Sequence, residues 1–92
     1  MNRYITRGIQ LTLPVELVML IWQWIDEKIP VEKDYLQVIN IAKGASGTEV
    51  TISQEVPEYE RKYVVPIELQ EDYKLFCVEE ADYQTLMLAD EY

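Results

Sequence analysis

Histidine is absent from this chain of 92 residues, and cysteine occurs only once, as Cys77. Without histidine the protein lacks the usual general base, the Ser-His and Cys-His nucleophile arrangements, and the commonest transition-metal ligand. A single cysteine cannot form a disulfide within the chain, which suits a reducing compartment such as the cytoplasm. Because Cys77 alternates with Tyr73 and Leu75, we predict a buried cysteine in a strand, without reactive character.

Basic residues are also scarce. There are 8 Lys and Arg against 17 Asp and Glu, which gives a net charge of −9 and a pI near 4.3. Nucleic-acid binding usually depends on Lys and Arg that neutralise phosphates, so we expect no direct binding of DNA or RNA. The acidity keeps a cytoplasmic protein soluble. It would also favour a basic protein partner, including one that itself binds nucleic acid.

No hydrophobic run is long enough to span a membrane. The longest strongly apolar stretch, Val15 to Ile25, is interrupted by Glu16 and Gln23. It falls short of the roughly 20 residues that a spanning helix needs. The N-terminal sequence MNRYITRG lacks the apolar run of a secretory signal. We therefore expect a cytoplasmic protein that has no membrane segment.

The acidic and glycine-rich segments do not have the spacing of known sites. Glu79, Glu80 and Asp82 form the densest carboxylate cluster, but they do not match a calcium-binding loop and favour a solvated turn. The segment KGASG at 43–47 precedes no helix and lacks the Lys and Ser or Thr of a phosphate-binding loop, so it predicts a hairpin loop. We predict no catalytic residue, no metal site and no cofactor.

From residue 35 onward the chain has the pattern of strands. Polar and apolar residues alternate, and β-branched and aromatic residues are frequent. The predicted strands are residues 35–42, 49–56, 59–69, 73–78 and 85–89. Pro66 indicates that the third of them lies at an edge of the sheet or carries a bulge. The last run, which contains LMLA, could equally begin a short helix, because period alone does not separate the two.

Before these strands we expect a short N-terminal strand and one helix. Ile9 to Leu13 alternates strictly and predicts a strand, with Gly8 marking a turn or bulge before it. A helix should cover about residues 14–28, because Pro14 suits its first turn and Pro30 cannot continue it.

Lys28 would lie favourably in the last turn of this helix. At 92 residues with 49% hydrophobic content, the chain has room for one core. The fold class is therefore α+β, a single domain over residues 1–92. It consists of a mainly antiparallel meander of five to six strands packed against one amphipathic helix.

The helix is more apolar than one sheet contact requires. One face consists of residues that suit packing on a sheet: Val15, Val18, Ile21, Trp22, Ile25 and Ile29. Leu17, Leu20 and Trp24 fall outside that face, with Met19 on the opposite flank, and these four residues are the candidate interface. Three possibilities remain for what covers this face: the chain's own C-terminal TLMLADEY or N-terminal arm, a second copy in a homodimer, or a different protein.

Tyrosine is frequent, with seven residues in the chain. Those in or beside the predicted strands are Tyr35, Tyr59, Tyr63, Tyr73 and Tyr83. Cross-strand packing accounts for most of them. The alternative is an aromatic, acidic face that grips a basic peptide or a sugar.

These features lead to three functional hypotheses. The first is a non-enzymatic protein-interaction module that acts through the helix face. The second is an acidic inhibitor or decoy of a nucleic-acid-binding protein, in which carboxylates stand in for phosphates. The third, a carboxylate-dependent hydrolase, needs a cleft in which two Asp or Glu have separated pKa values.

Four segments together resemble one known family. They are RYITRGIQLTLPVELVMLIWQWID at 3–26, DYLQVINI at 34–41, QEVPEYERKY at 54–63 and YQTLMLADEY at 83–92. The family consists of small uncharacterised proteins of Gram-positive Firmicutes, catalogued as a domain of unknown function, number nine hundred and sixty. The resemblance implies a bacterial cytoplasmic single domain and supplies no catalytic residue. Within TRG, it implies a turn that needs Gly8, with Arg7 available to pair a carboxylate.

Overall fold

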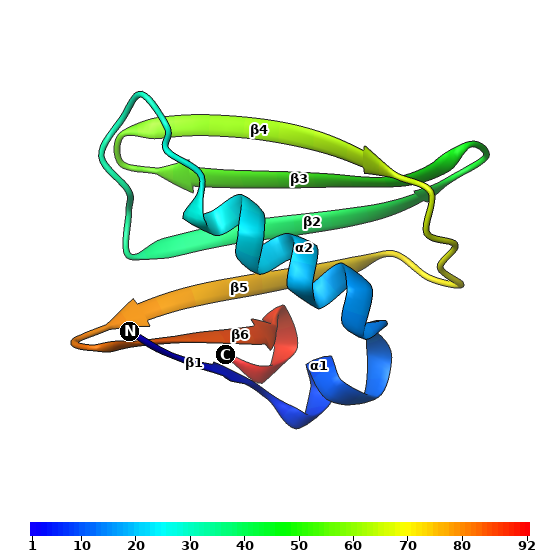
Figure 1. Cartoon of the computed structure of the whole chain (residues 1–92), viewed down its shortest axis with the longest axis horizontal. Helices are drawn as coiled ribbons and strands as arrows, with labels where there is room; N and C mark the ends of the chain where they lie inside the picture. Colours follow the sequence, from blue (N-terminus) through cyan, green and yellow to red (C-terminus); the bar gives the residue numbers. More distant parts are fainter.

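Six strands form one sheet, and two helices lie against it, in the computed structural model of residues 1–92 (Figure 1). In chain order the elements are β1 (Asn2–Ile5), α1 (Arg7–Thr12), α2 (Val15–Asp26), β2 (Leu36–Gly44), β3 (Gly47–Glu55), β4 (Glu58–Val65), β5 (Tyr73–Glu80), β6 (Tyr83–Leu88) and the 3-10 helix η1 (Ala89–Glu91). The order across the sheet is β1-β6-β5-β2-β3-β4. All neighbouring strands are antiparallel except β1 and β6, which are parallel.

The predicted meander is right for part of the sheet only. Strands β2, β3 and β4 follow one another across it, and β5 pairs with β6 as a hairpin. However, β5 pairs with β2 and not with β4, so the connection at residues 66–72 returns across the end of the sheet (yellow in Figure 1). Strands β4 and β1 are consequently the two edges of the sheet.

The edge position predicted from Pro66 is confirmed for β4. The strand is shorter than predicted, because it ends at Val65 and not at residue 69. Proline has no backbone N–H to donate to the ladder, which explains why the strand stops immediately before it. The segment after Pro66 runs as a loop and packs Ile67 and Leu69 against the core.

The prediction of a strand at Ile9 to Leu13 is wrong, because this segment lies in α1 and its C-cap. Thr6 caps the helix by accepting a hydrogen bond from the backbone N–H of Ile9. Ile9 and Leu13, four residues apart on one helical face, are buried, whereas Leu11 is 72% exposed. A run of five residues with alternate apolar positions fits a short helix as well as a strand. The N-cap hydrogen bond accepted by Thr6 favours the helix.

Helix α2 lies within the predicted range and ends two residues early. Its first turn is closed by the carbonyl of Pro14, which accepts from the N–H groups of Leu17 and Val18. At the C-terminal end, the Nη2 of Arg61 and the Nζ of Lys33 donate to the carbonyls of Trp24 and Ile25. Cations from β4 and from the loop before β2 thus supply the favourable charge that we had predicted for Lys28.

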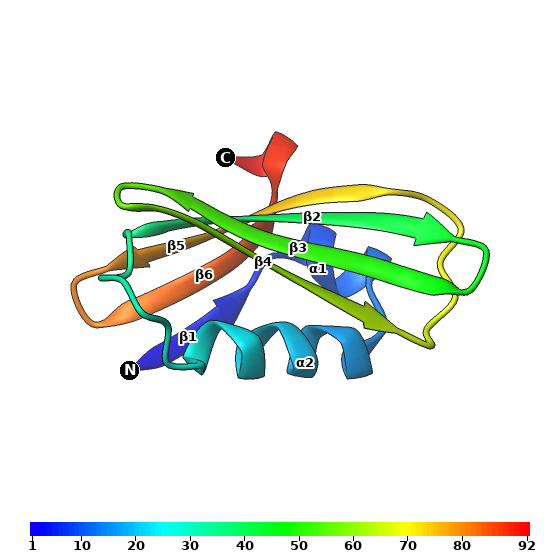
Figure 2. The same cartoon turned by 90° about the horizontal axis from the view of Figure 1, so that it is seen from above.

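The molecule has two layers, with α2 crossing one face of the sheet and only the short 3-10 helix η1 on the side of the other face (Figure 2). The core lies between these layers and consists of 15 buried residues. From the sheet it takes every second residue of β2, β3 and β5, for example Ile39, Ile52 and Leu75, which lie side by side in register. No helix in the structure combines the length and apolar character needed to cross a membrane.

A buried glutamine pair fixes the loop that follows α2. The Nε2 of Gln37 donates to the Oε1 of Gln54 over 2.8 Å. The Nε2 of Gln54 donates in turn to the carbonyls of Glu32 and Pro57 over 2.8 and 2.7 Å. Because buried amides are costly without partners, these bonds tie the loop before β2 to the turn between β3 and β4.

Candidate functional site

Two of the four helix residues predicted to form an interface are buried within the chain. Leu17 is 0% exposed and Trp24 is 7% exposed. The indole of Trp24 stacks on the ring of Tyr63 from β4, with centroids 4.2 Å apart and an angle of 7° between the planes. Of the covers left open for this face, the chain itself therefore supplies the one over Leu17 and Trp24.

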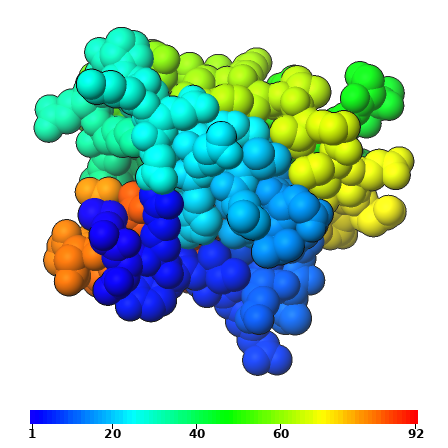
Figure 3. All heavy atoms as spheres, in the orientation of Figure 1, coloured from blue at the N-terminus to red at the C-terminus, as the bar shows by residue number.

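The cover of α2 comes from elements that the sequence did not identify as neighbours. Besides the sheet, α1 contributes Ile9 and Leu13, and the loop after β4 contributes Ile67 and Leu69. Figure 3 shows the segments on both flanks of the helix, α1 in blue and the loop in yellow. A flat sheet covers one side of a helix, but here packing comes from three directions.

The N-terminal arm, one of the covers considered for α2, does cover part of it. The guanidinium of Arg3 in β1 lies 4.7 Å from the ring centroid of Trp22 and forms an ion pair with Asp26. The side-chain hydrogen bonds from Arg3 lower the pKa of the Asp26 carboxyl. What remains uncovered on the helix is a small patch in which Val15 and Met19, one turn apart, are each 66% exposed, with Leu20 half-buried.

The C-terminal segment, the other cover considered, lies elsewhere. Figure 2 places the C-terminus on the side of the sheet opposite α2. The ring of Tyr92 meets Phe76 of β5 edge-on, with centroids 5.3 Å apart. Phe76 alternates with Leu75 and Cys77, which face the core, so its own side chain points to the open face.

Glu91 fastens this C-terminal segment to the start of α1. Its carboxylate accepts from the hydroxyl of Thr6 over 2.6 Å, and from the backbone N–H groups of Leu88 and Gly8 over 2.8 and 3.1 Å. These hydrogen bonds, led by the one from Thr6, lower the pKa of the Glu91 carboxyl. A Cβ at position 8 would lie 2.6 Å from the carboxylate. The glycine of TRG therefore permits this close approach, and the carboxylate comes from the chain's other end.

The open face of the sheet carries an apolar half, built from two cross-strand rows. In one row Val38, Phe76 and Met87 are direct partners across β2, β5 and β6. The adjacent row consists of Leu36, Val78, Thr85 and Tyr4. Val38, Phe76 and Met87 are each half-buried, and Val78 is 6% exposed. The two rows form a largely apolar surface, and the C-terminal segment with η1 and Tyr92 lies on the same side (Figure 2).

The other half of the open face is acidic and lies on β3 and β4. Its carboxylates are Glu49, Glu55, Glu58 and Glu60, all exposed. Lys62 is the only cation of β4 on this face, and its Nζ lies 4.0 Å from the nearest carboxylate oxygen of Glu49. A hollow of about 290 Å³ lies at the junction of the halves, lined by Asp34, Tyr35, Leu36, Val38, Ser53, Gln54, Glu55 and Lys74.

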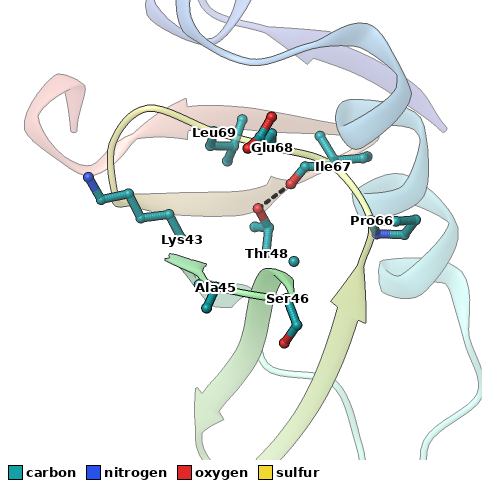
Figure 4. Close-up of a pocket in the computed structure, with 10 residues that line it drawn as sticks. Lys43, Ala45, Ser46, Thr48, Pro66, Ile67, Glu68 and Leu69 are labelled. Carbon is teal, nitrogen blue, oxygen red and sulfur yellow. Dashed lines mark hydrogen bonds between the residues drawn. The ribbon is translucent and has the colours of Figure 1, made fainter.

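A larger hollow, of about 660 Å³, lies between the KGASG loop and the segment after β4 (Figure 4). The predicted hairpin is confirmed, since the loop joins β2 to β3. The hydroxyl of Thr48 donates to the carbonyl of Ile67, and the Nζ of Lys43 donates to the carbonyl of Gln70 over 3.0 Å. The polar side chains here thus hold two loops together and offer no nucleophile with a base.

Cys77, Asp26 and Glu91 are among the groups with altered pKa values. Cys77 is buried in β5, as predicted, and burial raises its pKa to about 12, which leaves the thiol protonated. Asp26 and Glu91 have lowered pKa values, the opposite of what a general acid requires. No group of three or more His, Cys, Asp or Glu side chains is placed to hold a metal ion.

The fold is shared with a known structure. The chain is similar to the crystal structure of a protein of unknown function from Enterococcus faecalis, with a TM-score of 0.86 and 22% identity over 99% of this chain and 90% of the other. No curated protein matches it. A family model described as "Staphylococcal protein of unknown function (DUF960)" matches residues 2–91. Since that match spans nearly the whole chain, this protein belongs to that family.

Proposed function

We propose that this protein is a non-enzymatic protein-interaction module. It binds a basic, amphipathic segment of another protein on the open face of the sheet. The observation that supports this most strongly is the division of that face into two apolar rows and an adjoining acidic half. The apolar rows would take up the apolar side chains of the partner segment, and the carboxylates would bind its Lys and Arg.

The apolar rows fit a binding surface better than a solvated one. Along β5, Leu75 and Phe76 are both large and apolar although they point to opposite faces. A sheet with one solvated face normally alternates apolar and polar residues. Aromatic residues and Met are also enriched at the centres of protein interfaces, and this face carries Phe76, Met87 and Tyr92 together.

The acidic half supplies charge complementarity. Like-signed carboxylates on neighbouring strands repel each other, and one lysine on β4 offsets them only in part. A basic partner would relieve this repulsion and would be attracted from a distance. Since a lone free cysteine suits a reducing compartment, we place this interaction in the cytoplasm.

The test is affinity capture from a lysate of the native host with two matched variants. Phe76→Ser removes an aromatic ring from the centre of the apolar rows, whereas Met19→Ser changes the exposed patch on α2. Both must remain folded by circular dichroism. We expect Phe76→Ser to lose the captured partner and Met19→Ser to keep it. Loss with Met19→Ser alone would place the interface on the helix, where Met19 and Leu20 are the candidates that stay accessible.

The acidic half favours a second candidate, an acidic decoy of a nucleic-acid-binding protein. In that case the carboxylates of β3 and β4 would form the binding surface by themselves. Phe76→Ser would then leave binding intact, a rise in salt would abolish it, and DNA would compete for the partner. Binding that survives high salt and requires Phe76 would instead support the amphipathic segment.

A further inference from the structure

Strand β4 offers a free backbone edge of eight residues. It pairs with β3 on one side and ends the sheet on the other. None of the backbone hydrogen bonds outside helices and strands, and none of the side-chain bonds, engages the backbone of Glu58–Val65. Every second N–H and C=O of β4 therefore points outward without a partner in the chain, and such an edge is a template for another strand.

The opposite edge of the sheet is less suited to pairing. Strand β1 has only four residues. After Ile5 the chain turns at Thr6 into α1. Four residues provide about half as many outward backbone groups as eight, so β4 is the edge with the greater capacity for strand addition.

The side chains of β4 are complementary to themselves when the strand is reversed. If two copies run antiparallel about a two-fold axis at Arg61, residue 60 of one copy faces residue 62 of the other. Glu60 then opposes Lys62 twice, on the open face. Tyr59 opposes Tyr63 twice, on the face that carries α2. Opposite charges and aromatic pairs directly across an antiparallel ladder stabilise it.

Neighbouring registers are worse because they oppose like charges. An axis at residue 60 sets Glu60 against Glu60, although it also sets Glu58 against Lys62 twice. An axis at residue 62 sets Lys62 against Lys62 and leaves Glu60 opposite Val64, so only the axis at Arg61 gives opposite-charge pairs on the open face without a like-charge pair there. An axis that falls between two residues shifts the pairing by one residue and would place opposite faces of the two sheets on the same side. In the favoured register Arg61 opposes its own copy, but its Nη2 is bonded to the carbonyl of Trp24, which draws the guanidinium from the edge toward its own helix.

We propose that β4 is a homodimer interface, in which two copies of this chain pair their β4 strands antiparallel about Arg61 into one sheet of twelve strands. Both α2 helices lie on the same side of that sheet, so the two open faces become continuous. This inference is independent of the partner that the open face binds, since it uses only the edge of the sheet. Paired edge strands bury less than the roughly 1,600 Å² of a standard interface, so we expect a weak dimer with a Kd below about 1 mM.

The test uses charge reversal at the two facing positions of the full chain. Glu60→Lys makes both positions positive, and Lys62→Glu makes both negative, so each variant should repel its own copy. We expect each to weaken self-association at least about tenfold relative to the wild type, measured by sedimentation velocity at about 0.15 M salt. A mixture of the two variants restores both opposite-charge pairs and should form the heterodimer, visible by native mass spectrometry.

Two controls separate pairing from folding and from general charge effects. Lys74→Glu changes an exposed lysine on β5, away from the edge, and should leave the dimer intact. The double swap Glu60→Lys with Lys62→Glu should dimerise like the wild type. A wild type that stays monomeric up to about 1 mM, a dimer that Lys62→Glu leaves unchanged, or a mixture that forms no heterodimer overturns the proposal.

Discussion

The two faces of the sheet are built from the same strands, but only one of them is covered by a second layer of structure. On the face beneath α2, aliphatic residues such as Ile39, Ile52 and Leu75 are fully buried. On the open face, Val38 and Phe76 are only half-buried, because nothing but neighbouring side chains and Tyr92 covers them. The comparison shows that apolar character alone does not mark the core, since both faces carry it and only one has a second layer.

The same contrast recurs on α2. Leu17 and Met19 are two residues apart in the same helix, yet one is enclosed and the other is exposed. Side chains two positions apart on a helix do not face the same way. Covered and open surfaces therefore meet within single elements of this small protein.

The largest expected effect comes from a matched pair on the helix. Leu17→Ala should lower the free energy of unfolding by about 2 to 5 kcal/mol, because it leaves a cavity in the core. Met19→Ala should change it by no more than about 0.5 kcal/mol, as is usual for surface positions. Urea denaturation of both variants measures the difference, and equal losses would mean that Met19 is covered as well.

A pair on β5 sharpens the comparison between the two faces of the sheet. Leu75→Ala removes a fully buried side chain and should cost about 2 to 5 kcal/mol. Phe76→Ala, the next residue, loses a larger side chain but should cost only about 1 to 2 kcal/mol, since the ring is half-buried. A greater loss for Phe76→Ala, in the same denaturation experiment, would show that the open face acts as a second core.

The cap of α1 should have a smaller effect. Thr6→Ala removes the hydroxyl that caps Ile9 and binds Glu91, and should cost about 1 kcal/mol. Thr6→Ser keeps both hydrogen bonds and should behave nearly like the wild type. Thermal unfolding of the wild type and the two variants measures the loss of stability. A Thr6→Ala variant as stable as the wild type would mean that Glu91 holds the C-terminal segment without the hydroxyl of Thr6.

The smallest effect is a dependence of stability on pH. The folded-state pKa of Asp26 is lowered by the bonds from Arg3, so its stabilisation is complete above the ordinary carboxyl pKa of about 4. It is lost as the pH falls through the lowered value. Because the side chain of Asp26 is 60% exposed, we expect no more than about 1 kcal/mol.

Asp26→Asn provides the matched control for this dependence. Wild type and variant should differ most near neutral pH and converge as the pH falls below 4. Stability curves from denaturant melts across this range test the sign. A difference that grows on acidification would contradict the assignment of the ion pair.

Local patterns in the sequence predicted most of the sheet. Period two located β2, β3, β4 and β5 to within a few residues, and of the edge position or bulge that Pro66 predicted, the edge position is the one observed for β4. These features depend on nearest neighbours along the chain. The crossing from β4 back to β5 beside β2, and the parallel pairing of β1 with β6, depend on contacts between distant segments, which the sequence pattern does not contain.

Contacts between distant segments also explain why the candidate interface on α2 is largely covered. The apolar character of α2 predicts that its extra face needs a cover. It does not predict that Tyr63, Ile67 and Ile9, from three other parts of the chain, supply that cover. The open face did leave a signal in the sequence. The run LFCV at 75–78 is apolar at four successive positions, which is unusual for a strand with one solvated face.

We propose that the open face of the sheet binds a segment of another protein, whereas the face beneath α2 forms the hydrophobic core. The most direct measurement is the change in backbone amide shifts, by nuclear magnetic resonance, when the partner recovered with the wild type is added to labelled protein. We predict the largest changes along β2, β5 and β6 around Val38, Phe76 and Met87, with smaller changes on β3 and β4. Changes centred on Val15, Met19 and Leu20 of α2, with the open face unaffected, would contradict the account.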